Sequence, residues 1–418
     1  ASSPSRNLRK PMSDSPKSDG WLAFQSRDFR YFFSSRFLSS LSAMMIDVGV
    51  GWMVYAMTDS TFAIGLVGLC SFMPNIIFML AVGHAADRYD RRRVLIICYI
   101  GNTIASAGLI LCALTPGVDV WVVYALVLLA GTARAFANPA SQALLPMIVP
   151  REAFSSALAW NSTTWQVASI SGPALTGLAY MAGAHLVFIL TTLSYIICVL
   201  TLIAIKPRVA AAADEPVSWH TLTAGWRFIW AKPAILGSIS VDLFAVLLGG
   251  ATALLPAYAK EIFHTDSLGL GILTCMPAVG ALVCSLILAR TGVGGRCGHK
   301  MFGAVAIFGL ATVGFGLSTN IYVAGAFLII AGFVDMVSVQ IRQMLVQLET
   351  PDAMRGRVSA VNGIFIGASN ELGAFESGAL AALTGPVAAV VIGGVGSIVV
   401  AGAWAHLFPE LRKRDRLT

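Results

Sequence analysis

Long apolar segments recur from one end of this chain to the other, and they limit what it can fold into. Residues 94–114, 184–205, 301–318 and 385–407 are each close to the roughly 20 residues that span the hydrocarbon core of a bilayer. Charged residues make up 12% of the chain, about half the fraction typical of a soluble domain, and the mean hydropathy is +0.77. The sequence therefore predicts an all-α protein embedded in a membrane.

The apolar segments divide into two groups of six. Twelve transmembrane helices are predicted at 32–56, 61–82, 93–114, 120–146, 154–180, 184–205, 234–259, 268–289, 300–318, 320–346, 357–382 and 385–407. We expect two pseudo-symmetric six-helix bundles, at residues 31–206 and 234–408. The remaining segments are a disordered tail with an interfacial segment (1–30), a linker (207–233) and a second tail (409–418). The first 20 residues contain no apolar run, so they do not resemble a signal peptide.

Lysine and arginine are distributed unevenly between the two sides that these spans define. On one side the connections hold only Lys260, and nearly all the other basic residues lie in the opposite connections and in the terminal segments. The positive-inside rule then places both termini and the central loop in the cytoplasm. In the central loop, Trp219, Leu222 and Trp226 recur at helical spacing, which predicts a short helix lying at the membrane surface, with a flexible linker as the alternative.

Several function classes find no support in the sequence. The net charge of +7 follows from the loop asymmetry, and no basic face with interleaved aromatic residues suggests nucleic-acid binding. The seven cysteines and six histidines show no metal-ligand or disulfide spacing, so we expect no cofactor. No lysine follows a glycine, which excludes the phosphate-binding loop of ATP-driven pumps. No cluster of polar residues at one membrane face suggests an enzyme.

A faint internal repeat appears when the sequence is shifted by 201 residues. Without any gap, this shift superposes Gly131 on Gly332, Gln142 on Gln343, Pro150 on Pro351, Asn161 on Asn362, Gly172 on Gly373 and Gly177 on Gly378. Scattered identities between glycine-rich helices can arise by chance, but a single offset of nearly half the length preserves the order of the helices. Two parallel six-helix halves with a substrate site between them are a known transporter plan.

The loop after the second predicted span carries a recognisable motif. Residues 83–93 read GHAADRYDRRR, which resembles the G-x-x-x-D-R-x-G-R-R/K signature of the major facilitator superfamily, except that Asp90 replaces a glycine. The resemblance implies a cytoplasmic gate in which Asp87 faces the start of the eleventh span, where an anion near a helix N-terminus is stabilised. The gate residues implied are Gly83, Asp87, Arg88, Arg91, Arg92, Arg355 and Arg357. The competing interpretation is that the arginines only fix topology and contact anionic lipid.

A second motif, SGPALTG at residues 171–177, lies in the fifth predicted span. It is similar to the G-P-x-x-G element of antiporter branches of the superfamily, through Gly172, Pro173 and Gly177. Close packing between helices is an equally good explanation of these residues. Together with residues 138–162, the two motifs make the chain resemble the branch that includes bacterial enterobactin exporters and drug-efflux proteins. That resemblance implies export of a siderophore or another small amphipathic molecule, and a location in a bacterial inner membrane.

Ionisable residues at mid-membrane depth are costly, so each is a candidate functional residue. The candidates for proton coupling or the substrate cavity are Asp47, Arg134, Asp242, Asp335, Arg342, Glu371 and Glu376. The 201-residue shift pairs Arg134 with Asp335, which predicts that they face each other across the cavity, as a switchable or a permanent ion pair. Asp47, Asp242 and Glu371 have no arginine within one helical turn in the sequence, so they are the preferred proton carriers.

The sequence thus predicts a secondary transporter that exchanges protons for a small-molecule substrate across the lipid bilayer. Sodium is the alternative coupling ion. Uptake by proton symport is the alternative direction, because a fold does not fix direction. A transporter-like sensor and a membrane-embedded enzyme are the rivals from other classes. With no soluble association domain in the sequence, we expect a monomer.

Overall fold

The computed structural model describes residues 21–78, 81–82, 89–206 and 219–414, and for residues 151, 219–224, 352–353, 355–356 and 360 it describes the backbone alone. Helices form nearly all of this part of the chain, which contains no strand. The long helices of the first half are α1 (Arg27–Thr58), α2 (Thr61–Ile77), α4 (Arg91–Leu114), α5 (Val120–Ile148), α6 (Phe154–Met181) and α7 (Ala184–Ala204). Those of the second half are α9 (Pro233–Leu248), α11 (Ser267–Thr291), α12 (Cys297–Leu317), α13 (Ile321–Glu349), α14 (Asp352–Thr384) and α15 (Pro386–Leu407).

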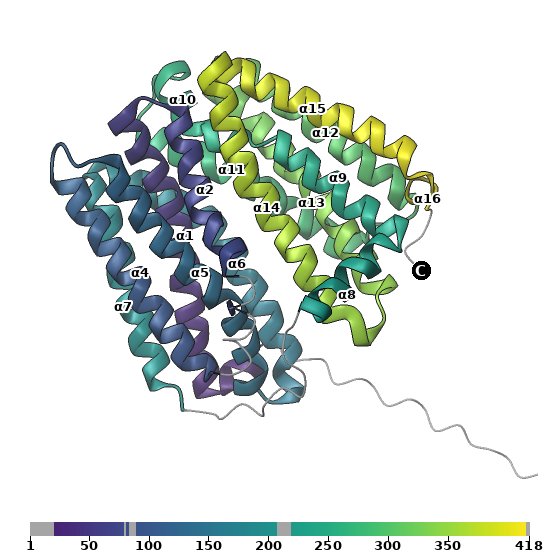
Figure 1. The fold of residues 1–418 in the computed structure, drawn as a ribbon, viewed down its shortest axis with the longest axis horizontal. Helices are drawn as coiled ribbons and strands as arrows, with labels where there is room; N and C mark the ends of the chain where they lie inside the picture. The colour runs from purple at the N-terminus through teal and green to yellow at the C-terminus, as the bar shows by residue number, and fades with distance from the viewer. Residues whose placement is uncertain (1–20, 79–80, 83–88, 207–218, 415–418) are drawn as a thin grey trace, which may run out of the picture.

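The helices form two bundles side by side, α1–α7 in purple to teal and α9–α15 in green to yellow (Figure 1). Nine spans among the described residues are long and apolar enough to cross a membrane. The helices α2, α6 and α14 fall outside that group, yet they occupy three of the predicted span positions. All three carry residues of the interface between the bundles, where glycine and polar side chains replace lipid-facing apolar ones.

Side-chain caps explain where many of these helices begin. Ser26, Ser60, Asp119, Asp266 and Asn320 each precede a long helix and accept a hydrogen bond from a backbone N–H of its first turn. Asp90 does the same for α4, with its carboxylate 3.0 Å from the amide nitrogen of Arg92. The residue that departs from the superfamily's glycine therefore has a local structural role, because it caps the helix that follows the motif.

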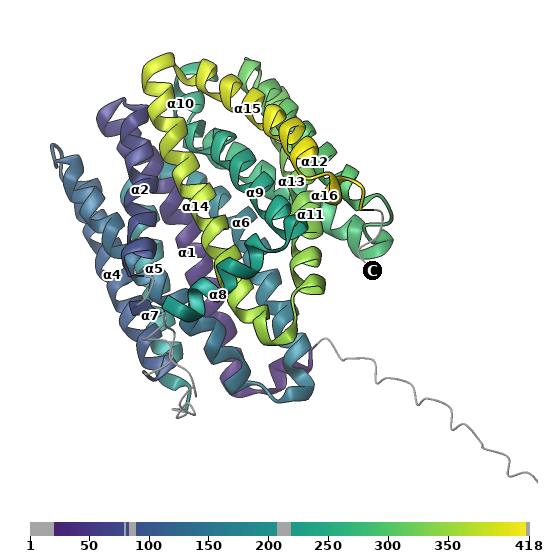
Figure 2. The same ribbon diagram turned by 45° about the vertical axis from the view of Figure 1, so that its right-hand side comes forward.

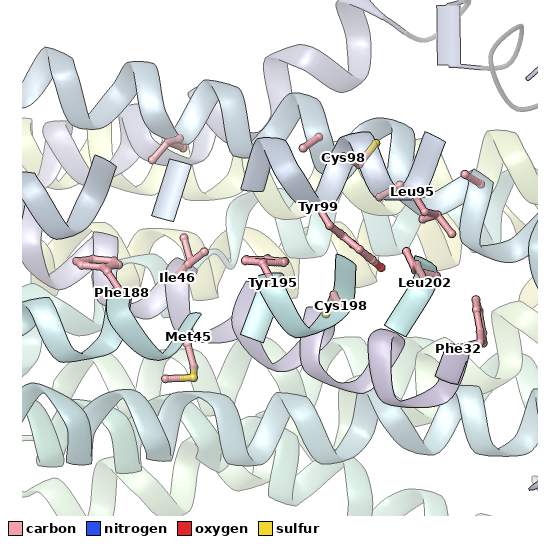
Figure 3. Close-up of a cluster of buried hydrophobic side chains, with 14 of the residues drawn as sticks. Phe32, Met45, Ile46, Leu95, Cys98, Tyr99, Phe188, Tyr195, Cys198 and Leu202 are labelled. Carbon is pink, nitrogen blue, oxygen red and sulfur yellow. The ribbon is translucent and has the colours of Figure 1, made fainter. Parts of the chain in front are cut away.

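The first half is held together by a continuous apolar core between α1, α4 and α7. Figure 3 shows side chains from these helices meeting, with Tyr99 of α4 beside Tyr195 of α7 and Cys198 between the helices. The Tyr99 and Tyr195 rings lie 6.0 Å apart, and the Tyr99 hydroxyl donates to Ser39 Oγ of α1 at 3.1 Å. The buried cysteines of this core, Cys98 and Cys198, pack as small apolar residues.

The two halves meet along two pairs of helices, α2 with α14 and α6 with α11, and Figures 1 and 2 both show α2 beside α14. A Cβ added to Gly378 of α14 would lie 2.8 Å from the Cα of Gly65 in α2. A Cβ added to Gly271 of α11 would lie 3.0 Å from the Cα of Gly177 in α6. Backbones therefore touch at both places, and the 201-residue repeat relates Gly177 to Gly378. The two interfaces are pseudo-symmetric copies of one packing arrangement.

The connections at the two ends of the bundles differ in charge. We call one the basic end; its described connections lie at 89–93, 204–206, 231–233, 290–300, 349–357 and 408–414. The opposite end has connections at 58–61, 115–120, 181–184, 258–267, 317–321 and 384–386, with Lys260 as its one Lys or Arg among these described residues. The glycine contacts lie toward the opposite end, because Gly65 is in the first turns of α2 and Gly378 in the last turns of α14.

The seventh predicted span is not a single helix. After α9 ends at Leu248, Gly249 and Gly250 lead into a 3-10 turn η3 (Ala251–Leu254), a short α10 (Leu255–Ala257) and a π-helical turn η4 (Tyr258–Ile262). Gly250 permits the break because a Cβ there would lie 2.6 Å from the carbonyl oxygen of Gly373 in α14. Two consecutive glycines and Pro256 weaken the helix at this point, so the span predicted at 234–259 is present as Pro233–Ile262 but is interrupted after Leu248.

The segment joining the halves contains the helix that the spacing predicted. The helix α8 (Trp219–Trp230) packs on α14, where the Trp226 ring stacks on Phe365 with centroids 5.3 Å apart and an interplanar angle of 14°. Gly225 allows this approach, since a Cβ there would lie 2.9 Å from the carbonyl oxygen of Arg357. Its position at the membrane surface stays a prediction, and residues 1–20, 207–218 and 415–418 lie outside the described part of the chain.

Candidate functional site

A cavity of about 260 Å³ lies between the two halves. The first half contributes residues of α1, α2, α4 and α5 to its wall, and the second contributes η3, α10, α11 and α14. Most of the lining is apolar, and three of the described lining residues are ionisable, namely Asp47, Arg134 and Glu371. Three of the candidates expected at mid-membrane depth therefore share one cavity.

Asp47 of α1 and Arg134 of α5 form a bidentate ion pair on one wall of this cavity. The distance is 2.8 Å from Arg134 Nη2 to Asp47 Oδ1, and 3.2 Å from Nη1 to Oδ2. The side chains keep 28% (Arg134) and 43% (Asp47) of their accessible surface, so the pair faces open space. Asp47 has no arginine within one helical turn in the sequence, but its partner comes from another helix, 87 positions away.

Glu371 faces the cavity from α14, in the other half. It makes no hydrogen bond and no ion pair with the described residues, although Asp47 and Arg134 are close enough to interact with it electrostatically. Gly68 of α2 allows this placement, because a Cβ there would lie 3.0 Å from Ala374 Cβ and 3.6 Å from Glu371 Oε2. An unpaired carboxylate from one half thus lies near the ion pair of the other.

A second group of charges is buried inside the second half. Asp242 of α9 pairs with Arg342 of α13, and the two are 5% and 2% exposed. Asp242, Asp335 and Ser338 line a separate cavity of about 10 Å³, and the Ser338 hydroxyl is buried with no hydrogen-bond partner. One expectation from sequence was wrong here, because Asp335 lines this separate cavity and does not face Arg134 across the main one. Asp242 has no arginine within one helical turn in the sequence, but its arginine partner lies on another helix.

The two ion pairs belong to corresponding helices but differ in depth. A shift of 201 residues would place Asp47 on Leu248 and Arg134 on Asp335. Asp242 precedes Leu248, and Arg342 follows Asp335, by about two helical turns each. Since α9 starts at the basic end and α13 finishes there, both displacements move the second pair toward the basic end.

The broken helix supplies a wall of the main cavity that sequence reasoning missed. Thr252, Ala253, Leu255 and Pro256 line it, and all four lie in η3 and α10. Irregular backbone at membrane depth is tolerated where it is buried in protein or lines a cavity. The adjacent glycines and the proline were the signal in the sequence for this element.

The other sequence candidates lie away from the cavity. Glu376 of α14 is partly buried, accepts a weak hydrogen bond from Ser377 Oγ at 3.5 Å and does not line the cavity. In the motif of α6, a Cβ on Gly172 would lie 2.5 Å from Met44 Cβ of α1. The carbonyl oxygen of Pro173 would lie 2.7 Å from a Cβ on Gly271. The structure thus gives Gly172, Pro173 and Gly177 packing contacts with α1 and α11.

The predicted gate is described only in part. Gly83, Asp87 and Arg88 lie outside the described residues, as does the side chain of Arg355. Arg92 donates to the carbonyl oxygens of Leu202 and Ile203, both at 2.7 Å, and so caps the last turn of α7. Arg91 and Arg357 contact the sulfur atoms of Met147 and Met354. The gating role stays a prediction.

Polar contacts at the opposite end also join the halves. Lys260 Nζ of η4 lies 2.5 Å from Asp59 Oδ1, at the end of α1, and 5.5 Å from the centroid of the Tyr55 ring. The Tyr55 hydroxyl donates to Glu261, the residue that follows Lys260. In the sequence, Lys260 stands out only as the exception to the uneven distribution of Lys and Arg between the two sides. Nothing in the sequence indicates Asp59 as its partner.

Comparison with known proteins gives a consistent picture. Residues 18–417 match the family described as "Transmembrane secretion effector". Among curated relatives, an enterobactin exporter of Citrobacter koseri is 28% identical over 366 residues, which is 86% of each chain. The enterobactin exporter of Shigella boydii serotype 18 is 27% identical over 367 residues, again 86% of each chain.

Solved structures share the fold at lower sequence identity. A bacterial homologue of the human lysosomal transporter Spinster, described as inward-facing and occupied, has a TM-score of 0.74 at 13% identity. The match covers 91% of this chain and 96% of that one. The nucleoside transporter NupG has a TM-score of 0.70 at 15% identity, with 91% of this chain and 99% of that chain covered. These matches identify the fold.

Proposed function

Since this chain belongs to the transmembrane secretion effector family, within the major facilitator superfamily, we propose that it exports a small amphipathic molecule, such as a siderophore or a drug-like compound, from the cytoplasm. The observation that carries the proposal is the cavity between the halves, which is mostly apolar and holds three charged side chains. Such a cavity suits a molecule with a large apolar part and a few polar groups. The enterobactin exporters among its relatives favour export over uptake.

The direction of transport needs an orientation, and the charges of the loops supply one. The basic end concentrates Lys and Arg, which supports a cytoplasmic location for that end and for both termini. The described connections of the opposite end carry Asp59, Asp119, Glu261 and Asp266, with Lys260 as their one Lys or Arg. We therefore assign the opposite end to the outer face of a bacterial inner membrane.

In this orientation the glycine contacts close the outer side of the cavity. Gly65 with Gly378, and Gly177 with Gly271, bring backbones together between the cavity and the outer face. Substrate then enters from the cytoplasm and leaves after the halves rock apart at these contacts. The gate that closes the cytoplasmic side would use Asp87 and the arginines around it, and Asp87→Asn is expected to lower transport while membrane insertion is unchanged.

We propose protons as the coupling ion. A carboxyl group that exchanges a proton must lose and regain its charge during the cycle. Glu371 and Asp335 suit this role, because neither makes an ion pair with the described residues. Asp47 and Asp242 suit it less, because each is already held in an ion pair with an arginine. We propose that one monomer carries out the whole cycle.

The test uses inside-out membrane vesicles acidified by respiration, with a pH-sensitive dye inside. Candidate siderophores and amphipathic drugs are added one at a time. We expect proton efflux from the lumen on adding a substrate, and we expect no efflux with Glu371→Gln. Glu376→Gln is the matched control, since it makes the same change on the same helix outside the cavity. If substrate instead accumulates in right-side-out vesicles together with protons, the protein is an importer and export is excluded.

A further inference from the structure

The cavity between the halves carries a net negative charge. Of its described lining residues, Asp47 and Glu371 are acids and Arg134 is the single base. With all three ionised, their charges sum to minus one. The remaining lining offers hydroxyl groups from Ser71, Thr252 and Thr274 and is otherwise apolar or backbone.

The single arginine is already committed to a partner. Both terminal nitrogens of Arg134 donate to the carboxylate of Asp47, one oxygen each. An anionic ligand that reached the remaining N–H groups of this guanidinium would share it with Asp47, and it would bring its own negative charge into a cavity that already holds two carboxylates. Bidentate contacts of this kind are stronger than single hydrogen bonds between arginine and carboxylate.

Glu371 is the charged side chain of the cavity that has no oppositely charged partner among the described residues. It has no hydrogen bond or ion pair among the described residues, and it sits at mid-membrane depth, where an ionised carboxylate without a partner is costly. A cationic group placed beside Glu371 removes much of that cost, whereas a second anion adds to it. The apolar wall around it, with Ile46, Val67 and Leu270, can hold hydrocarbon or aromatic parts of the same ligand.

From these observations we propose that the substrate is an amphipathic organic cation, with its positive group beside Glu371 and its apolar part against the walls of α1, α2 and α11. The inference rests on the proposed export function and narrows its substrate class. It places a deprotonated, anionic siderophore among the compounds that the cavity rejects.

The test uses two probes of one shape and opposite charge, tetraphenylphosphonium and tetraphenylborate. Purified full-length protein in a nonionic detergent is dialysed to equilibrium against each ion, with a protein-free micelle control for partitioning. We expect saturable binding of tetraphenylphosphonium and none of tetraphenylborate. We expect Glu371→Gln to weaken phosphonium binding tenfold or more, and Glu371→Asp, which keeps the charge, to retain part of it.

The control variant is Glu376→Gln, which should bind phosphonium like the wild type because its side chain does not line the cavity. Size-exclusion profiles and thermal midpoints show that each variant is folded. Equal or tighter binding of tetraphenylborate, phosphonium binding that survives Glu371→Gln, or no saturable binding of either ion would each overturn the proposal. Proton-coupled export of an anionic siderophore in the vesicle assay would overturn the substrate class and leave the export function standing. If no compound is exported although phosphonium binding is intact, the export function is overturned and the substrate class stands.

Discussion

The two halves of the molecule carry the same kind of ion pair on corresponding helices, and they use it differently. In the first half, Asp47 and Arg134 face the main cavity and remain partly accessible. In the second, Asp242 and Arg342 are enclosed by protein, about two turns nearer the basic end, beside a cavity of about 10 Å³. The repeat therefore preserved the helix framework and the type of charge, whereas the depth of the charges diverged. One pair is available to a ligand, and the other is a fixed element of the second bundle.

The largest expected effect comes from breaking the enclosed pair. Arg342→Met leaves Asp242 without its partner in the protein interior, beside a second carboxylate, Asp335. Breaking a buried pair in this way costs about 3–5 kcal/mol. We expect little folded protein and a large fall in the thermal midpoint, measured by size exclusion and thermal unfolding. Arg342→Met with Asp242→Leu should recover much of the loss. A single variant as stable as wild type would contradict the assignment of this pair as a fixed element.

The glycine contacts test whether packing, unlike charge, is equivalent in the two halves. Gly378→Ala puts a methyl group 2.8 Å from the Cα of Gly65, and Gly177→Ala puts one 2.7 Å from the carbonyl oxygen of Ser267. Overpacking of this kind costs about 1–3 kcal/mol. We expect both variants to weaken closure at the opposite end by similar amounts, seen as faster labelling of a cysteine introduced in the cavity. Gly402→Ala, which meets no atom within 4 Å, is the control. Faster labelling in only one of the two variants would show that the two interfaces are not equivalent.

Breaking the exposed pair, Asp47 with Arg134, should change ligand binding more than it changes the stability of the protein. Arg134→Gln removes the one base from the cavity and leaves two acids facing it. We expect tetraphenylphosphonium to bind several-fold more tightly, with a smaller loss of stability than for Arg342→Met, because solvent in the cavity screens Asp47. Equilibrium dialysis and thermal unfolding of the same samples measure both quantities. Weaker phosphonium binding would show that Arg134 orients the ligand site, contrary to this expectation.

The smallest effect is expected at the exposed contacts that join the halves at the opposite end. Lys260→Met removes the bond to Asp59, and both side chains are largely accessible to solvent. Exposed pairs of this kind contribute about 0.2–1 kcal/mol. We expect a change in transport rate of less than about fivefold, and we expect wild-type protein at high salt to behave like the variant. A much larger loss of transport would show that this pair is a principal contact holding the two halves closed.

Much of the fold was predictable because lipid makes strong demands on sequence. Most spanning helices need a long apolar run, and caps such as Ser60 and Asp266 sharpen the boundaries, so the predicted helices match those observed within a few residues in most cases. The break after Leu248 was missed because no charged residue interrupts the stretch from Leu243 to Ala259. Its two glycines look like ordinary packing residues until α14 is seen to lie against them.

The residue types that form the site could be predicted from the sequence, but the pairs that they form could not. Depth in the membrane singled out Asp47, Arg134 and Glu371, all three of which line the cavity. Partners within one helical turn are readable from sequence, whereas partners on other helices depend on how those helices cross. The repeat suggested Asp335 as the residue opposite Arg134, but Asp335 lines the small cavity inside the second half and does not face the main one.

The broken helix has a consequence for how the protein is made. The segment Pro233–Ile262 is apolar enough to enter the membrane as one span. The backbone that fits against its break, at Gly373 of α14, is translated much later. During synthesis this stretch has no partner for its irregular backbone, so it is expected to begin as a continuous helix and to break only when α14 arrives. The wall of the cavity is then completed late in biogenesis, and a chain truncated before α14 would insert its helices without forming the binding site.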